Sequence, residues 1–122
     1  MNIIERETVS EQLLPGRFMQ KIVGKASDGY LSDSQILNIG YCRYCAEAGP
    51  MEPHMHAEET VQILSSDRAW VRFGPEKSKL PNKVFLKKDM TLHIPEGEWH
   101  VFEYEEGGSL EILFIYGSKV AL

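Results

Sequence analysis

Short runs of β-favouring residues alternate along the chain with turn-forming residues. Pairs such as Asp28-Gly29 and Gly74-Pro75 recur about every eight to twelve residues, a spacing typical of short strands joined by turns. A parallel α/β fold would need long amphipathic helices between the strands, and the pattern contains none. We therefore predict an all-β fold, with one short N-terminal helix over residues 5–14. The predicted strands cover residues 18–23, 36–46, 60–64, 69–73, 84–87, 91–94, 100–104 and 110–116.

The last of these strands, residues 110–116, is apolar on both faces toward its end. A strand with this pattern is buried on both sides, at the centre of a sheet or at a subunit interface. We therefore expect a homodimer, although a central strand explains the same pattern.

Composition narrows the class of protein. The chain has 122 residues, of which 43% are hydrophobic and 25% are charged, and this predicts a single globular domain over residues 1–122. The net charge of −5 lacks the basic footprint of a nucleic-acid-binding protein. The sequence contains neither an apolar run long enough for a membrane span nor a legible signal peptide. We expect a cytoplasmic protein with no nucleic-acid or membrane partner.

Cys42 and Cys45 form a CxxC pair inside a predicted strand. Residues three apart on a strand face opposite ways, so the two thiols are not expected to share a ligand. The sequence has no second CxxC pair to complete a zinc site. We predict structural thiols in a reducing compartment.

Two histidines follow the turn at Gly49-Pro50. His54 and His56 are two residues apart, so on an extended chain both imidazoles project from the same face. Both could therefore reach one metal ion at the usual distance of ~2.0–2.1 Å. Glu58 and Glu59 follow, where the chain enters its next predicted strand.

Another histidine lies beyond a second turn. Pro95 and Gly97 end one predicted strand, and His100 begins the returning one. His93 alternates with its apolar neighbours Leu92 and Ile94, so it faces the other way. We predict that His93 packs against the protein or supports a metal ligand rather than binding the metal itself.

Together these residues resemble the two motifs of the cupin superfamily, a HxH pair followed by a glutamate and a PxG turn followed by a histidine. Residues 49–66 match the first motif and residues 89–104 match the second. The resemblance implies a single-domain double-stranded β-helix, or jelly-roll barrel, and a metal site that contains His54, His56 and His100.

The glutamate of the first motif departs from the family pattern, because Thr60 stands where it is expected. Glu59 fits if the segment is one residue shorter, and Val61 would then also face inward. In the rival frame Gln62 faces inward and offers an amide oxygen. We rank Glu59 first, Gln62 second and Glu58 third, and a three-histidine site without an acid remains open.

Three histidines and a carboxylate suit Mn(II), Fe(II), Co(II), Ni(II) or Zn(II). A six-coordinate ion with four protein ligands keeps two open positions, which can take adjacent oxygens of a substrate and polarise them. We predict a Lewis-acid enzyme, of isomerase, epimerase, lyase or dioxygenase type, acting on a small oxygenated metabolite such as a sugar derivative or oxo acid. The alternatives are a binding protein without turnover and a metal-free ligand-binding barrel.

Turnover needs a group that transfers protons, and the sequence offers Tyr44, Glu58 and His93 as candidate catalytic residues. Other side chains are expected to line the pocket. These are Tyr41, Tyr44, Arg43, Trp70, Phe73, Phe102 and Tyr116.

Overall fold

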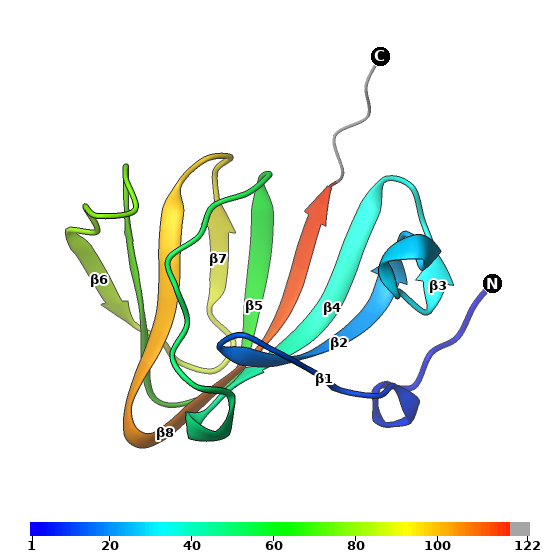
Figure 1. The fold of residues 1–122 in the computed structure, drawn as a ribbon, viewed down its shortest axis with the longest axis horizontal. Helices are drawn as coiled ribbons and strands as arrows, with labels where there is room; N and C mark the ends of the chain where they lie inside the picture. Colours follow the sequence, from blue (N-terminus) through cyan, green and yellow to red (C-terminus); the bar gives the residue numbers. More distant parts are fainter. Residues whose placement is uncertain (118–122) are drawn as a thin grey trace.

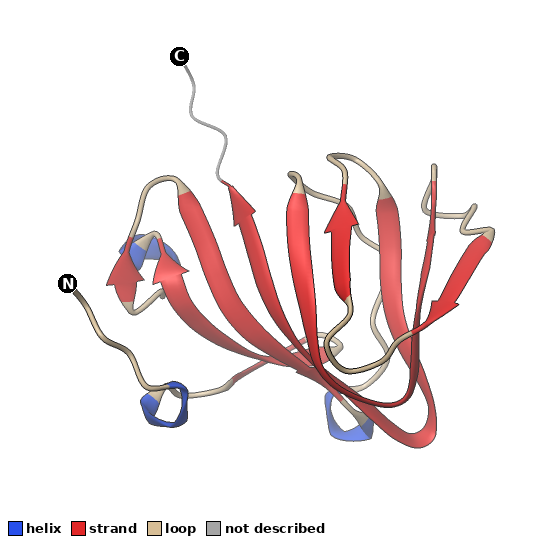
Figure 2. Cartoon of the chain, turned by 180° about the vertical axis from the view of Figure 1, so that it is seen from behind, coloured by secondary structure: helices blue, strands red, loops and turns tan. Residues whose placement is uncertain are grey.

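The computed structural model describes residues 1–117, whose β-strands form one eight-stranded sheet (Figure 1). Three single turns of 3-10 helix are the only helical segments in this part of the chain (Figure 2). The prediction of an all-β fold is therefore confirmed. The strands are β1 (Gln12–Leu14), β2 (Arg17–Gly24), β3 (Ser32–Asp33), β4 (Leu37–Tyr44), β5 (Glu59–Gly74), β6 (Asn82–Phe85), β7 (Thr91–Ile94) and β8 (Trp99–Gly117). The helical turns are η1 (Arg6–Thr8), η2 (Ala26–Asp28) and η3 (Ala46–Ala48).

The prediction of a helix over residues 5–14 is wrong. Only η1 is helical there, and the chain is already extended at Val9, with φ −95° and ψ 125°. Pro15 and Gly16 then form a two-residue turn that pairs β1 with β2, with Gly16 at φ +84°. The turn residues and the β-branched Thr8 and Val9 favour a hairpin, whose hydrogen bonds replace those of a helix.

Four predicted strands join into two long ones. Residues 60–64 and 69–73 belong to β5, and residues 100–104 and 110–116 belong to β8. The turn signals between them produce bends rather than reversals. The register of β5 against β8 shifts at two places, and the backbone adopts φ 54° at Arg68 and φ 79° at Gly107.

The bend divides the sheet into two halves that share β5 and β8. In the first half, β8 after the bend lies between β4 and β5, and β7 pairs with β5 on its other side. In the second half, β5 after its own bend lies between β6 and the first part of β8. All of these strand pairs are antiparallel, whereas β3 pairs with β2 in parallel.

Inward-facing side chains from both halves form one hydrophobic core. Burial alternates along β4 and along both parts of β5, as the period of a strand requires. Val61, Ile63 and Leu110 have no exposed surface. The core contains Cys42, Tyr44, Val61, Ile63, Ala69, Val71, Leu86, Ile94, Phe102, Leu110, Ile112 and Phe114.

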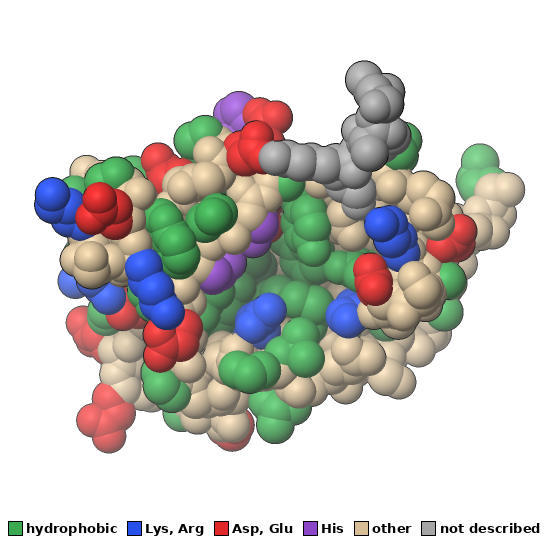
Figure 3. Space-filling view, turned by 45° about the horizontal axis from the view of Figure 1, so that its top comes forward, with side chains coloured by type: hydrophobic (Ala, Val, Ile, Leu, Met, Phe, Trp, Pro, Cys, Tyr) green, Lys and Arg blue, Asp and Glu red, His purple; other side chains and the backbone are tan. Residues whose placement is uncertain are grey.

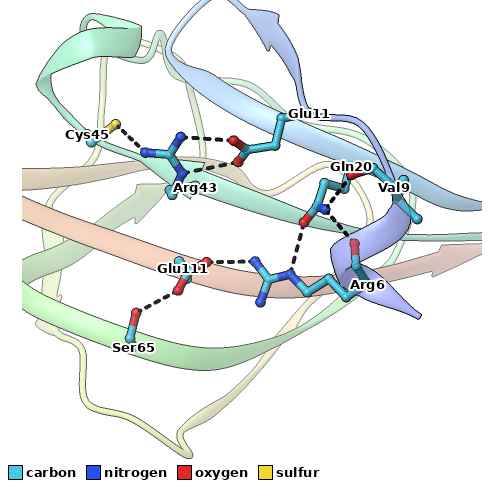
Figure 4. Close-up of polar contacts among 8 residues, drawn as sticks. All are labelled: Arg6, Val9, Glu11, Gln20, Arg43, Cys45, Ser65 and Glu111. Carbon is cyan, nitrogen blue, oxygen red and sulfur yellow. Dashed lines mark hydrogen bonds and ion pairs between the residues drawn. The ribbon is translucent and has the colours of Figure 1, made fainter. Parts of the chain in front are cut away.

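The N-terminal segment is fastened across β2 and β8 by polar side chains (Figure 4). Arg6 donates from Nε to Gln20 Oε1 at 2.9 Å and from Nη2 to Glu111 Oε1 at 2.6 Å. The amide of Gln20, a buried side chain, donates in return to the carbonyls of Arg6 and Val9. These bonds satisfy a polar group that would otherwise be costly to bury.

The two cysteines are free thiols, and both are buried. Cys42 lies in the core, whereas Cys45 follows β4 and its sulfur accepts a hydrogen bond from Arg43 Nη1 at 3.4 Å (Figure 4). In residues 1–117 we find no helix with the length and apolar character needed to cross a membrane.

Candidate metal centre

Two of the motif histidines are fixed to each other through the backbone. The amide of His54 donates to the carbonyl of His100 at 3.0 Å, and the amide of His100 donates to the carbonyl of His54 at 2.9 Å. They form an isolated antiparallel bridge between the first motif and the start of β8. The two segments are far apart in sequence, and this bridge sets their imidazoles side by side, with ring centres 4.4 Å apart.

The turn of the second motif holds the third histidine. Gly97 has φ +81°, a conformation that favours glycine, and its amide donates to the carbonyl of His56 at 3.1 Å. The ring of His56 lies 5.3 Å from that of His54 and 5.5 Å from that of His100. The PxG turn therefore positions a ligand of the other motif as well as the histidine that follows it.

One nitrogen from each of His54, His56 and His100 lies within 4.8 Å of the other two. Two nitrogens bound to one ion at ~2.0–2.1 Å are at most about 4.2 Å apart, so the three rings need to move by only a few tenths of an ångström to bind a common ion. The sequence predicted that these three side chains share a site, and the structure brings them together.

Backbone carbonyls select the tautomer of each ring. The Nδ1 atoms of His54, His56 and His100 lie 3.4, 3.2 and 3.1 Å from the carbonyls of Glu52, Ala57 and Glu98, respectively. A carbonyl only accepts, so each Nδ1 carries the proton and each Nε2 presents a lone pair. This outer hydrogen bond is the usual arrangement of a metal-binding histidine.

His100 Nε2 supplies a test of whether the residues fit a metal. The side chain is 1% exposed, and in the described chain Nε2 is buried without a hydrogen-bond partner. A buried polar atom without a partner is costly, and a metal ion at the centre of the three rings would satisfy it. The donor set therefore fits a divalent transition ion.

Glu59 faces the same centre. Its carboxylate lies 3.3 Å from His56 Nε2 and 3.7 Å from His100 Nε2, and the residue is 5% exposed. The burial pattern at the start of β5 turns Glu59, Val61 and Ile63 inward. The structure therefore matches the alternative in which the first motif is one residue shorter and Glu59, rather than Gln62, faces the histidines.

The other two acid candidates point elsewhere. Gln62 faces outward on β5, and its Oε1 accepts a hydrogen bond from Thr91 Oγ1 at 2.6 Å. Glu58 Oε2 lies 2.6 Å from His93 Nε2, and both of these side chains are 68% exposed. Neither candidate lines the cavity beside the three histidines.

Burial governs the protonation of the centre. Desolvation, followed by the neighbouring His100 and His56, lowers the pKa of His54 from 6.5 to about 3. Desolvation also lowers the pKa of both His56 and His100. The histidines are therefore neutral at physiological pH, as metal ligands must be. Desolvation raises the pKa of Glu59 from 4.5 to about 8, because a buried carboxylate without a cation is unfavourable.

The three candidate catalytic residues are separated by the structure. Tyr44 lines the cavity, but it is 3% exposed, and desolvation raises the pKa of its phenol well above the usual value. Glu58 and His93 are paired on the outer surface. The packing role predicted for His93 is wrong, because its position on β7 faces outward, opposite Thr60.

A cavity of about 100 Å³ adjoins the histidines. Figure 3 shows histidine and basic side chains around a hollow whose walls are largely hydrophobic. The cavity is lined by Arg17, Met19, Cys42, Tyr44, Met51, His54, His56, Glu59, Phe102, Ile112, Phe114 and Tyr116.

The predicted pocket lining is only partly right. Tyr44, Phe102 and Tyr116 line the cavity, and the Tyr116 ring lies 5.0 Å from that of His56. The other predicted side chains lie away from it. Tyr41 packs under Arg6, Arg43 pairs with Glu11, Trp70 donates to Glu103, and Phe73 lines a different cavity.

Sequence reasoning missed Arg17 and Met51. Both reach the cavity because the β1–β2 turn packs against the end of η3 and the segment that follows it. The Gly16 amide donates to the carbonyl of Ala48, the last residue of η3, at 3.1 Å. A side chain added at Gly16 would lie 2.7 Å from Met51 Cα, so this approach requires glycine. The Pro15-Gly16 pair predicts a turn from the sequence, but only the structure shows that this turn contacts the segment at Met51.

No protein-family profile matches the sequence, and no curated protein matches it. Solved structures match over nearly the whole chain. The polyketide cyclase RemF from Streptomyces resistomycificus has a TM-score of 0.70 at 17% identity, covering 98% of this chain and 80% of RemF. The Cnp3 cupin domain from Schizosaccharomyces pombe has a TM-score of 0.64 at 13% identity, covering 93% and 71%.

A structure of Fe(II)-HppE with an alternative substrate has a TM-score of 0.68 at 12% identity. It covers 95% of this chain, which spans 60% of HppE. A Co(II) complex of HppE matches as well. At these identities the likeness concerns the backbone alone, and it agrees with the all-β architecture. The chain has the cupin fold.

Proposed function

We propose that this protein binds one divalent transition metal through His54, His56, His100 and Glu59 and uses it on a small oxygenated metabolite. The observation that carries the proposal is the convergence of three imidazoles whose Nδ1 atoms all face carbonyls. Three lone pairs and one carboxylate then surround a buried point. Mn(II), Fe(II), Co(II), Ni(II) and Zn(II) all suit such a donor set.

A bound metal of this kind would act as a Lewis acid toward oxygen atoms of the substrate. The residues of the chain would supply the rest. Met19, Phe102 and Phe114 keep water from the inner wall of the cavity, and the carbonyls behind the histidines hold the rings in one tautomer. Glu59, uncharged at neutral pH when the metal is absent, would lose its proton on loading.

One observation favours a second function, metal-assisted binding without turnover. Of the predicted proton-transfer residues, Glu58 and His93 are paired outside the cavity, and Tyr44 is a buried phenol with a raised pKa. A binding protein needs no such group, whereas an isomerase, epimerase or lyase does. Ligand-induced stabilisation without product would identify the binding function.

Metal content tests the proposal first. Protein prepared without a polyhistidine tag is analysed by elemental mass spectrometry, and we expect close to one ion per chain. His54→Ala and His100→Ala should each lose the ion while the far-ultraviolet circular dichroism is unchanged. His93→Ala is the matched control, because it removes an exposed imidazole from the same half of the sheet. Full metal content in both site variants would show that the ligand assignment is wrong.

A further inference from the structure

Arg17 differs from every other arginine of the chain in its electrostatic surroundings. Each of the others lies within 3.0 Å of a carboxylate oxygen, in the pairs Arg6–Glu111, Arg43–Glu11, Arg68–Asp67 and Arg72–Glu103. Figure 4 shows two of these pairs on the sheet. Within residues 1–117, Arg17 forms no such pair, and its hydrogen bond to a carbonyl runs from Nη1 to Pro15 at 2.9 Å.

The guanidinium of Arg17 belongs to the metal cavity. It lines that cavity together with His54, His56 and Glu59, and its charge contributes to the lowered pKa of both His54 and His56. A guanidinium carries five N–H donors in a planar fork that matches a carboxylate. Besides the Pro15 carbonyl, the guanidinium contacts the thiol of Cys42, and its other donors have no carboxylate partner within residues 1–117, so the cavity holds a cation that lacks an ion pair.

The β1–β2 turn positions the Arg17 side chain at the cavity. Arg17 begins β2 directly after the turn at Pro15-Gly16, and the left-handed Gly16 lets that turn touch the segment at Met51. The half-buried Arg17 side chain thereby lines the cavity. Met19, two residues further along the same face of β2, lines the cavity as well.

The rest of the cavity selects by size and polarity. Beyond Arg17, the histidines and Glu59, its walls include the apolar side chains of Met51, Phe102, Ile112 and Phe114. A volume of about 100 Å³ accommodates a molecule of only a few carbon and oxygen atoms. Tyr44 and Tyr116 add polar atoms to the same lining, so it is the small volume and the charge of Arg17 that favour a small acid over a sugar.

We infer that Arg17 binds the carboxylate of a small oxo or hydroxy acid whose neighbouring oxygen faces the three-histidine centre. This inference rests on the proposed function and narrows it, because it chooses the oxo acid over the sugar derivative. A carboxylate compensates the charge of Arg17 and accepts two of its hydrogen bonds. The second oxygen of the molecule then lies on the side of His54 and His56.

Equilibrium binding tests this inference with two probes of nearly equal shape. Pyruvate carries a carboxylate, and pyruvamide replaces it with a neutral amide. Each is titrated calorimetrically into Co(II)-loaded protein, whose visible absorption bands also report any oxygen that reaches the metal. We expect pyruvate to bind about tenfold or more tightly than pyruvamide.

Variants assign that preference to Arg17. In Arg17→Gln the preference should fall severalfold while the cobalt content is unchanged, whereas Arg17→Lys should keep more of the preference. Lys21→Gln is the matched control, because it removes one positive charge from the same strand outside the cavity. Pyruvamide binding by Arg17→Gln also shows that the variant is folded.

Equal binding of the two probes by the wild-type protein would overturn the inference, and so would an undiminished preference in Arg17→Gln. The proposed function fails in a different way, through absence of metal. If the protein binds no metal, the same titrations with the metal-free protein still test the inference, because Arg17 alone should bind pyruvate more tightly than pyruvamide. No preference in either form of the protein would refute the assignment of Arg17.

Discussion

His54 and His100 exchange two backbone hydrogen bonds, of 3.0 and 2.9 Å, and thereby join the two histidine-bearing motifs at the candidate metal centre. The bonds belong to the backbone, so replacing either side chain leaves them in place. The bridge therefore explains why a His→Ala variant at these positions should lose metal without losing its fold. It also means that backbone geometry near the bridge controls the spacing of the ligands.

Gly97→Ala should weaken both the fold and the metal site. The residue has φ +81°, which costs an L-residue about 1–2 kcal/mol, and nothing lies within 4 Å of an added methyl group. Strain at this turn would disturb its hydrogen bond to the His56 carbonyl. We expect a lower free energy of unfolding by denaturant and several-fold weaker metal binding.

Gly107→Ala is the matched control for that variant. Gly107 has φ +79° in the bend of β8 rather than at the metal centre. It should lose similar stability and keep its metal affinity. Equal loss of metal affinity in the two variants would argue against a special role for the PxG turn.

The metal-free protein should be most stable near pH 6.5. Below that value the unfolded chain protonates histidines that the fold keeps neutral, with the His54 pKa lowered to about 3, so stability falls as the pH falls. The raised Glu59 pKa, about 8, acts oppositely from about pH 4.5 upward, but below pH 6.5 this single group is outweighed by the three histidines with lowered pKa. Above pH 6.5 the unfolded carboxyl has already lost its proton, so stability falls as the pH rises toward 8, by up to about 1.4 kcal/mol per pH unit.

Glu59→Gln isolates the alkaline part of this dependence. The variant has no carboxyl to ionise, so its stability should remain level between pH 6.5 and 8 while the acid loss persists. Urea unfolding at several pH values, in the presence of a chelator, measures how the free energy of unfolding changes both below and above pH 6.5. An unchanged alkaline fall in the variant would assign it to another group.

Removal of metal should lower the melting temperature. An ion present at a hundred times its Kd stabilises the folded state by about 2.7 kcal/mol, which corresponds to several degrees for a chain of this length. Differential scanning calorimetry before and after EDTA should show this shift in the wild type. His56→Ala should melt at the same temperature in both conditions.

The expected homodimer has a definite candidate surface. On the outer face of the first half-sheet, Ile39 pairs with Ile115 and Tyr41 pairs with Leu113. Ile115 is 37% exposed, and the nearby Leu37 is 42% exposed. If this face joins two copies, Ile115→Glu should convert a dimer to a monomer in light scattering after gel filtration. Phe85→Glu on β6 is a control, because it adds a charge to an exposed strand of the second half-sheet.

Local patterns predicted most of the strands, because the alternation of apolar residues and the turn pairs carry that information. These local patterns gave wrong strand ends where residues typical of a turn lie at a bend within one continuous strand. Ser65 to Asp67 and the pair at Gly107 resemble ordinary turns, yet β5 and β8 pair through these positions. The partner strand decides between a reversal and a bulge, and it lies far away in the sequence.

The histidines could be located from spacing alone, and the inward frame of Glu59 followed from the period of the strand. Arg17 could not be found in this way. It reaches the cavity through a contact between the β1–β2 turn and the segment at Met51, and no local pattern encodes that contact. His93 shows the opposite case, since its alternation was read correctly but its face is open to solvent.

The two long strands have a consequence for how the molecule comes apart. Since β5 and β8 each run through both halves of the sheet, neither half has a backbone of its own that could stay intact while the other melts. Partial opening is thus confined to the marginal strands β1, β3, β6 and β7, each of which pairs with one neighbour. Slow amide exchange along both strands, with a single rate-limiting event, would be the signature of such an indivisible unit.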